Sequence, residues 1–178
     1  SKTEKSFKDS IGVVFDEGFF YDELTLTQMK NLIASSYSHW DNGAYTHYLD
    51  AFSLRPDQTI SSLSRGMKMK FSLALALSHH AELLIMDEPT SGLDPLVRKQ
   101  FIEILKEFMD QGGKAVFYST HNTSDLDKAA DMLVMIDNGK ILFEEDKDML
   151  LETHRLVKGK GLLPAETKKL FLKVEQTK

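Results

Sequence analysis

The sequence contains no cysteine among its 178 residues, which excludes disulfide bonds, thiolate nucleophiles and cysteine metal ligands. It also has no apolar run that approaches the roughly 18 residues of a membrane-spanning helix. The formal net charge is -5, so the overall charge offers no attraction to nucleic acid. The 42% of hydrophobic and 28% of charged residues are typical of globular domains. We therefore expect a folded cytoplasmic protein with no nucleic-acid partner.

A second absence concerns phosphate binding. A P-loop needs the pattern Gly-x-x-x-x-Gly-Lys followed by Ser or Thr, because its N–H groups and its lysine cradle phosphates. The sequence has Gly-Lys pairs at Gly113, Gly139 and Gly159, and they are followed by alanine, isoleucine and glycine. None of these pairs forms a P-loop.

The centre of the sequence places two carboxylates directly after an apolar run. Residues 83–86 read Leu-Leu-Ile-Met, and Asp87, Glu88 and Pro89 follow at once. A short continuous apolar run is typical of a buried strand. Open parallel sheets bind ligands outside the carboxyl ends of their strands, where these two acids would lie. The alternative is a strand that ends at a charged surface turn.

The order of the elements predicts an α/β fold. We expect strands at residues 11–15, 83–86 and 115–120, and helices at residues 68–80, 96–111 and 122–130. Alternation of strands and helices predicts a parallel sheet with crossover helices. Asp16, Asp87, Glu88 and His121 would then share one edge of the sheet. An Asn138-Gly139 pair between apolar runs predicts a β-hairpin near the C-terminus.

Residues 25–62 differ in character, since aromatic residues recur there at helical spacing. Thr25 is placed to cap a first helix, and Trp40, Tyr45, Tyr48 and Phe52 follow. We expect a small helical subdomain inserted between strands, with its aromatic stripe in the core.

Two acids and a histidine at one edge are compatible with metal binding, acid–base catalysis or phosphoryl transfer. Ser64, Arg65 and Gly66 stand at the start of the expected helix 68–80. Backbone N–H groups and the helix dipole at such a position favour a phosphate ligand. The sequence therefore favours phosphoryl transfer.

Four motifs in order resemble the ATP-binding subunit of an ABC transporter. They are similar to the signature motif, Walker B, D-loop and H-loop of that family, and they are Leu63-Ser64-Arg65-Gly66-Met67, residues 83–89, Ser91-Gly92-Leu93-Asp94 and Ser119-Thr120-His121. The four are linked over about sixty residues, so they are far more specific than a lone Asp-Glu pair.

The resemblance covers nearly the whole chain. The helical segment, Trp40 with Asp41, and the hairpin look like ATPases that are paired with ABC-2-type exporters. The resemblance implies a P-loop NTPase-like fold. It divides the chain into an α/β core (residues 1–24 and 63–155), a helical subdomain (residues 25–62) and a C-terminal extension (residues 156–178).

The resemblance also implies ATP and Mg²⁺ as cofactors. Asp87 would hold the Mg²⁺ ion, as Walker B aspartates do. Glu88 would orient or deprotonate the attacking water. His121 would contact the γ-phosphate and sense its presence.

The implied partners are a second ATPase domain and a membrane permease. Ser64 and Gly66 would bind the γ-phosphate of ATP held by the second subunit, and Asp94 would link the two sites across that dimer. Arg65 and Asp94 are also candidates for binding ATP. The permease would hold the subunit at the inner face of the cell membrane.

Two departures concern single positions. The signature reads Leu-Ser-Arg-Gly-Met where the family has Leu-Ser-Gly-Gly-Gln, but Ser64 and Gly66 are kept. The Q-loop glutamine is replaced by Asp16, followed by Glu17. A carboxylate there could still approach the Mg²⁺ ion, so we treat Asp16 as a candidate for binding both cofactors. The alternative is an exposed acidic turn.

The missing P-loop is the largest departure. In the family it lies well upstream of the Q-loop, and only fifteen residues precede Asp16. We therefore expect these residues to be part of a longer protein that carries the P-loop and the first strands of the sheet. On that expectation, these residues alone bind ATP weakly or not at all. The Walker B strand should also lack one neighbour, which would leave an apolar edge open to self-association.

The leading hypothesis is thus an ATPase subunit that powers a transporter. One alternative is a soluble ABC-type ATPase of the translation or DNA-repair kind. Fewer than fifty residues separate Asp16 from Ser64, which leaves no room for the long coiled coil of repair-type members. Another alternative is a non-catalytic binding module on the same fold. The missing P-loop favours this alternative, and the presence of Glu88, the expected catalytic carboxylate, argues against it.

Overall fold

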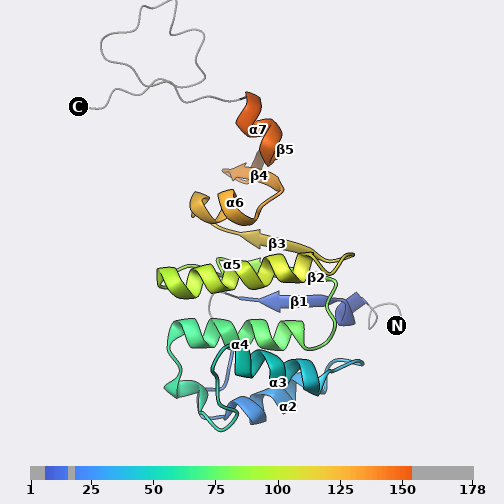
Figure 1. Cartoon of the computed structure of the whole chain (residues 1–178), viewed down its shortest axis with the longest axis vertical. Coiled ribbons are helices and arrows are strands. Elements are labelled where there is room, and N and C mark those ends of the chain that lie inside the picture. The colour runs from blue at the N-terminus through green and yellow to red at the C-terminus, as the bar shows by residue number, and fades with distance from the viewer. Residues whose placement is uncertain (1–6, 16–18, 154–178) are drawn as a thin grey trace, which may run out of the picture. The chain divides into compact units, whose positions relative to one another are not determined.

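The computed structural model describes residues 7–15 and 19–153. The chain divides into two compact units, residues 1–130 and 131–178, and each is described by itself. The helices and strands of the first unit that Figure 1 labels are β1 (Ile11–Val14), α2 (Leu26–Ala34), α3 (Asn42–Ala51), α4 (Arg65–Leu77), β2 (Leu83–Asp87), α5 (Pro95–Met109), β3 (Ala115–Ser119) and α6 (Thr123–Ala129). A 3₁₀ turn at Ile60–Ser62 precedes α4.

The first unit contains a parallel sheet in the order β1-β2-β3. β2 pairs in parallel with β1 on one side and with β3 on the other. In this register Gly12 lies opposite Leu84, and Asp87 lies opposite Ser119. The predicted parallel sheet with crossover helices is confirmed. The prediction that the Walker B strand lacks a neighbour is wrong, because β2 is the central strand and pairs on both sides.

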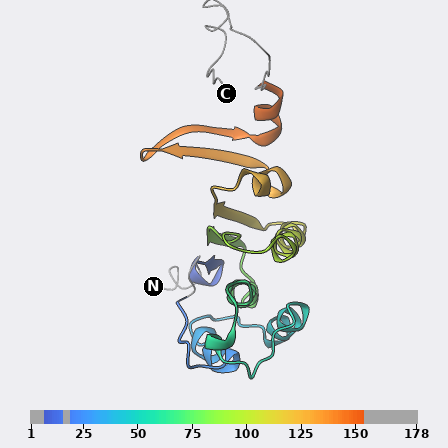
Figure 2. The same cartoon turned by 90° about the vertical axis from the view of Figure 1, so that its left-hand side faces the viewer.

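The helices α4 and α5 lie on the same face of this sheet, as Figure 2 shows. That face carries Val14, Leu84 and Met86, which are all buried. The other face is open within the described residues: Val13 is 42% exposed and Phe117 is 62% exposed. The strand expected at residues 115–120 is present as β3, but helices cover it on one side alone in the part of the chain described.

A glycine allows α4 to pack closely on the sheet. A Cβ atom at Gly12 would stand 2.7 Å from Cδ2 of Leu84 and 2.9 Å from the carbonyl oxygen of Ala76. Both distances are shorter than real Cβ contacts. The absence of a side chain at Gly12 thus sets how near the backbone of α4 comes to β1.

The segment 25–62 is helical, as predicted. Thr25 caps α2 in a reciprocal capping box with Gln28, in which each side chain bonds the other residue's N–H group. Tyr45, Leu49 and Phe52 are buried in the core, which confirms the interpretation of the aromatic stripe. The division into an α/β core and a helical subdomain remains a prediction.

Side-chain caps decide where the two long helices begin. We expected the first near Lys68, but α4 begins at Arg65, because Oγ of Ser64 accepts from the N–H of Met67 at 3.3 Å. We expected the second at Leu96, and α5 begins one residue earlier, at Pro95. Proline suits this first helical position, since its missing N–H group would have no partner there.

The second unit contains a hairpin of β4 (Met132–Asp137) and β5 (Lys140–Asp146), followed by α7 (Lys147–Thr153). Asn138 and Gly139 form its turn with φ of 47° and 73°. Both values lie in the left-handed region that a type I′ turn requires. The predicted hairpin is confirmed.

Candidate functional site

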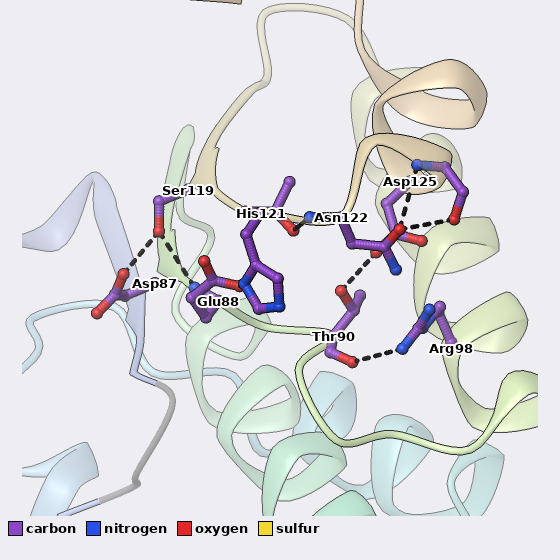
Figure 3. Close-up of polar contacts among 10 residues, drawn as sticks. Asp87, Glu88, Thr90, Arg98, Ser119, His121, Asn122 and Asp125 are labelled. Atoms are coloured by element: carbon purple, nitrogen blue, oxygen red, sulfur yellow. Dashed lines mark hydrogen bonds and ion pairs between the residues drawn. The ribbon is translucent and has the colours of Figure 1, made fainter. Parts of the chain in front are cut away.

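The residues predicted to be catalytic meet at the carboxyl edge of the sheet. Asp87 is the last residue of β2, and Glu88 follows it. Ser119 ends β3, and His121 comes two residues later. Because β2 and β3 are parallel and in register, their ends bring these side chains together (Figure 3).

Glu88 has a constrained backbone and a half-buried side chain. Its φ is 45°, in the left-handed region that costs a non-glycine residue about 1–3 kcal/mol. Its N–H donates to the carbonyl oxygen of Ser119 at 3.1 Å and approaches the Ser119 hydroxyl at 3.3 Å. The structure thus holds Glu88 in a conformation that its sequence alone would not favour.

The carboxylate of Glu88 lies against the imidazole of His121. Nδ1 of His121 is 2.9 Å from Oε2 of Glu88. The contact is short but not aligned as a hydrogen bond, and Oε2 is buried without another partner in the described residues. The His121 side chain is 77% exposed, whereas that of Glu88 is 27% exposed. A ligand that entered from solvent would therefore meet the imidazole before the carboxylate.

Asp87 presents an exposed carboxylate beside this pair. Its Oδ1 accepts a hydrogen bond from Oγ of Ser119 at 2.6 Å. Among residues 7–15 and 19–153, no group of three or more His, Asp or Glu side chains converges as a metal site. Mg²⁺ is commonly held by one or two carboxylates together with substrate phosphates and water, and an exposed aspartate fits that mode.

Ser64 and Gly66 lie at the start of α4, where its first N–H groups point outward. A Cβ atom at Gly66 would meet nothing nearer than Cγ1 of Val97, at 3.6 Å, which is an ordinary contact. Packing within the described chain therefore gives no reason for a glycine at this position.

Arg65 and Asp94 contact the turn after β2. The Arg65 guanidinium lies over Gly92, where a Cβ atom would stand 2.9 Å from Nη1. Gly92 has a φ of 67°, so a side chain there would be strained for a second reason. Oδ1 of Asp94 caps α5 by accepting from the N–H groups of Leu96 and Val97, each at 3.1 Å. Arg65 and Asp94 thus both shape this turn.

Asp16, the predicted replacement for the Q-loop glutamine, lies outside the described residues. The structure brings Asp87, Glu88 and His121 together and places Ser64, Arg65, Gly66 and Asp94 around the starts of α4 and α5. The roles assigned to all eight residues remain predictions.

Sequence reasoning missed three residues that support the site. Ser119 belongs to the motif that is similar to the H-loop, but the sequence gives no sign of its bonds to Asp87 and to the Glu88 backbone. Thr90 and Asp125 are 1% and 0% exposed and are hydrogen-bonded to each other. The position of Asp125, four residues after His121, is a signal that could have identified it. Nothing in the sequence indicates that Thr90 is its partner.

A partly buried tyrosine precedes Ser119 on β3. Burial, and secondarily the negative charge of Asp125, raise the pKa of Tyr118 to about 12. Its hydroxyl has no hydrogen-bond partner within the described part of the chain. Tyr118 is therefore neutral at physiological pH.

Comparison with known proteins gives a family. Residues 5–127 match the family model described as "AAA domain, putative AbiEii toxin, Type IV TA system". The chain is 30% identical over 156 residues to the bacitracin transport ATP-binding protein BcrA of Bacillus licheniformis, covering 86% of this chain and 51% of that protein. It is 37% identical over 100 residues to the Nod factor export ATP-binding protein I of Rhizobium sp. (strain N33), covering 56% of this chain and 33% of that protein.

Solved structures agree on the fold. One described as the ATP-binding subunit of an ABC transporter superposes with a TM-score of 0.72 at 23% identity, over 85% of this chain and 65% of that one. A dimeric post-hydrolysis state of the ATP-binding cassette MJ0796 with ADP and Pi gives a TM-score of 0.70 at 21% identity, over 82% and 66%.

The chain spans about half the length, or less, of the curated relatives that it matches. No helix in its described residues is both long and apolar enough to cross a membrane. The match to the family model covers well over half of the chain, and the resemblance noted in the sequence is confirmed by the curated relatives. The chain belongs to the AAA domain family and is a homologue of the ATP-binding subunits of ABC transporters.

Proposed function

We propose that the gene product carrying this chain hydrolyses ATP to power a membrane transporter. The observation that carries the proposal is the contact between Glu88 and His121, 2.9 Å apart beside the Asp87 carboxylate. A carboxylate, a histidine and a second carboxylate at one sheet edge match the needs of phosphoryl transfer to water. The bacitracin and Nod factor relatives are named as transport and export proteins.

Asp87 would hold Mg²⁺ through water, together with phosphate oxygens of ATP. Its exposure leaves room for a hydrated ion. Ser119 would fix the orientation of the Asp87 carboxylate, since its hydroxyl donates a 2.6 Å hydrogen bond to one of the two carboxylate oxygens. Mg²⁺ would neutralise charge that develops on the transferred phosphoryl group.

Glu88 would act on the attacking water. A general base has to lie within hydrogen-bond reach of the proton that it takes, and a half-buried carboxylate on a fixed backbone meets this need. His121 would contact the γ-phosphate from the solvent side. Because the two side chains already touch, a phosphate bound at His121 would lie close to the Glu88 carboxylate.

The start of α4 would bind ATP that is held by a second ATPase domain. Ser64, Arg65 and Gly66 lie there, and an unhindered glycine allows a phosphate to approach the backbone N–H groups. Asp94 would lie near the boundary between the two domains. ATP would thereby join two such domains face to face.

The remaining partner is a membrane permease, which would place the protein at the cytoplasmic face of the membrane. Asp16 would take the place of the Q-loop glutamine and approach Mg²⁺ and ATP. No nucleic acid is proposed as a partner, in keeping with the net charge of -5.

The test is ATP hydrolysis by the full-length gene product, purified alone and with the membrane protein encoded beside it. We expect Mg²⁺-dependent phosphate release that falls by at least about 100-fold in Glu88→Gln. ATP binding should persist in that variant. No ATP binding by the full-length protein, or equal rates for wild type and Glu88→Gln, would overturn the proposal.

A further inference from the structure

A cluster of polar side chains lies behind the site, in which Thr90 and Asp125 are buried and Arg98 is partly buried. We call Thr90, Arg98 and Asp125 the Thr90 cluster (Figure 3). Oγ1 of Thr90 donates to Oδ2 of Asp125 at 2.5 Å. Nη2 of Arg98 donates to the carbonyl oxygen of Thr90 at 3.3 Å. Thr90 is thus held by its side chain on one side and by its backbone on the other.

This cluster is an unfavourable way to gain stability. Asp125 is 0% exposed, and burial of a carboxylate is costly unless its oxygens are fully hydrogen-bonded. Oδ1 of Asp125 and Nε of Arg98 are buried without a hydrogen-bond partner in the residues that the structure describes. Apolar side chains of the same size would fill this space at lower cost. The choice of polar residues therefore calls for another explanation.

The cluster joins three segments that lead to site residues. Thr90 lies two residues after Glu88, Asp125 four residues after His121, and Arg98 four residues after Asp94. The first link is stiff, because the N–H of Ser91 donates to the carbonyl oxygen of Glu88 at 3.0 Å. A shift of Thr90 would therefore shift Glu88.

The link to His121 is equally direct. Asp125 lies on α6, which follows His121 and is capped by the side chain of Asn122, 3.2 Å from the N–H of Ser124. One hydrogen bond, from Thr90 to Asp125, thus connects the segment after β2 with the segment after β3. Those two segments carry the groups that meet at 2.9 Å.

We propose that the Thr90–Asp125 hydrogen bond positions Glu88 against His121. Thr90 and Asp125 are positioning residues, since both are buried and neither reaches the open side of the site. They act through the two backbone segments that they join. The catalytic part of this inference rests on the proposed function, whereas the geometric part does not.

The kinetic test uses the full-length gene product. Thr90→Val removes the hydroxyl while keeping the shape, and Asp125→Leu removes the acceptor with an apolar side chain of similar size. We expect each to lower kcat by about 100-fold, because a small misplacement of a reacting group has this effect. KM for ATP should change by less than about twofold, since neither residue contacts the nucleotide.

Three variants serve as controls. Thr90→Ser keeps the hydroxyl and should retain most of kcat. Asp127→Leu makes the same chemical change at an exposed residue of α6 and should leave kcat unaltered. The double variant Thr90→Val/Asp125→Leu should be no slower than either single variant, because both substitutions remove the same hydrogen bond.

A second readout does not depend on hydrolysis. The imidazole NMR signals of His121 report its contact with Glu88, and Glu88→Gln should shift them. Thr90→Val and Asp125→Leu should shift them as well, whereas Thr90→Ser and Asp127→Leu should not. Unchanged His121 signals in folded Thr90→Val and Asp125→Leu would overturn the inference. It would also be overturned if these two variants had the same kcat as Asp127→Leu. A wild-type protein without ATPase activity would overturn the proposed function instead and leave the NMR test in force.

Discussion

His121 and Glu88 touch across the ends of two parallel strands, with Nδ1 and Oε2 2.9 Å apart. The contact forms between side chains of this chain alone. It orients a carboxylate that the backbone already constrains through a φ of 45° at Glu88. Fixed orientation before the ligand arrives lowers the cost of reaching the reactive geometry. The pair is thus organised by the fold rather than by a ligand.

The first prediction concerns the carboxylate of this pair. Glu88→Gln keeps the size of the side chain but removes its ability to take a proton. We expect kcat for ATP hydrolysis to fall by about 10²–10⁴-fold in the full-length protein, while ATP still binds. Phosphate release and binding of a fluorescent ATP analogue would measure the two effects.

Glu82→Gln provides the matched control for this prediction. Glu82 is exposed and precedes β2, so it lies at the opposite end of the same strand. The substitution should leave both rate and binding unchanged. An equal loss of rate in Glu82→Gln would show that charge in general, and not the position of Glu88, controls the reaction.

The second prediction concerns Ser119, whose hydroxyl donates to Asp87 and lies near the backbone N–H of Glu88. Ser119→Ala should free the Asp87 carboxylate and raise the Mg²⁺ concentration needed for half-maximal hydrolysis by about 10-fold or more, as loss of an outer hydrogen bond does at metal sites. Ser119→Thr keeps the hydroxyl and should remain near wild type. Mg²⁺ titrations of ATPase activity at saturating ATP would decide, and equal Mg²⁺ dependence in Ser119→Ala and wild type would contradict the prediction.

The parallel sheet and the meeting of Asp87, Glu88 and His121 could be predicted from the sequence because they follow from local pattern. An apolar run that ends in acids marks a strand tip, and parallel strands bring their tips to one edge. The bond between Thr90 and Asp125 could not be predicted, since it joins residues 35 positions apart. A threonine and an aspartate in isolation carry no signal of burial or pairing.

The exposure of β3 could not be predicted for a different reason. Its apolar residues imply burial, and the sequence does not state which segments cover each face of a sheet. Within the described residues, α4 and α5 both lie on the face of Leu84 and Met86, so Phe117 remains 62% exposed. The local pattern of apolar residues therefore predicts that β3 is a strand, but not which of its faces is packed against helices.

The third prediction concerns pH. Burial lowers the pKa of His79 below its ordinary value of 6.5. Nδ1 of His79 donates a hydrogen bond to the carbonyl oxygen of Asp9, 3.1 Å away, and this bond offsets part of the lowering. The folded state thus favours the neutral ring, which also stacks on Tyr37 with ring centroids 3.8 Å apart. Below about pH 6.5 the unfolded state binds more protons than the folded state, so stability should fall as pH drops.

Urea unfolding at pH 7.5 and pH 5.5 would measure this loss. One histidine contributes a slope of at most about 1.4 kcal/mol per pH unit to the free energy of unfolding. His79→Gln should flatten the slope, although it also lowers stability at both pH values. An unaltered slope in His79→Gln would assign the pH dependence to other groups.

The last prediction separates two glycines that have different reasons to be glycine. Gly12→Ala would place a Cβ atom 2.7 Å from Leu84 and 2.9 Å from the backbone of Ala76, so we expect a loss of about 1–3 kcal/mol in stability. Gly66→Ala would meet an ordinary contact of 3.6 Å at Val97 and should raise helix stability by up to about 1 kcal/mol.

Gly12→Ala is expected to be the less stable of the two variants, but Gly66→Ala is expected to be the one that loses function. In a Glu88→Gln background, which preserves bound ATP, light scattering would measure ATP-driven dimerisation of the full-length protein. Gly66→Ala should abolish dimerisation, because its methyl group would occupy the space through which the partner's γ-phosphate approaches the start of α4. Folded Gly12→Ala should still dimerise, since Gly12 faces Leu84 and Ala76 inside the protein. Normal dimerisation of Gly66→Ala would remove the structural support for phosphate binding at this helix start.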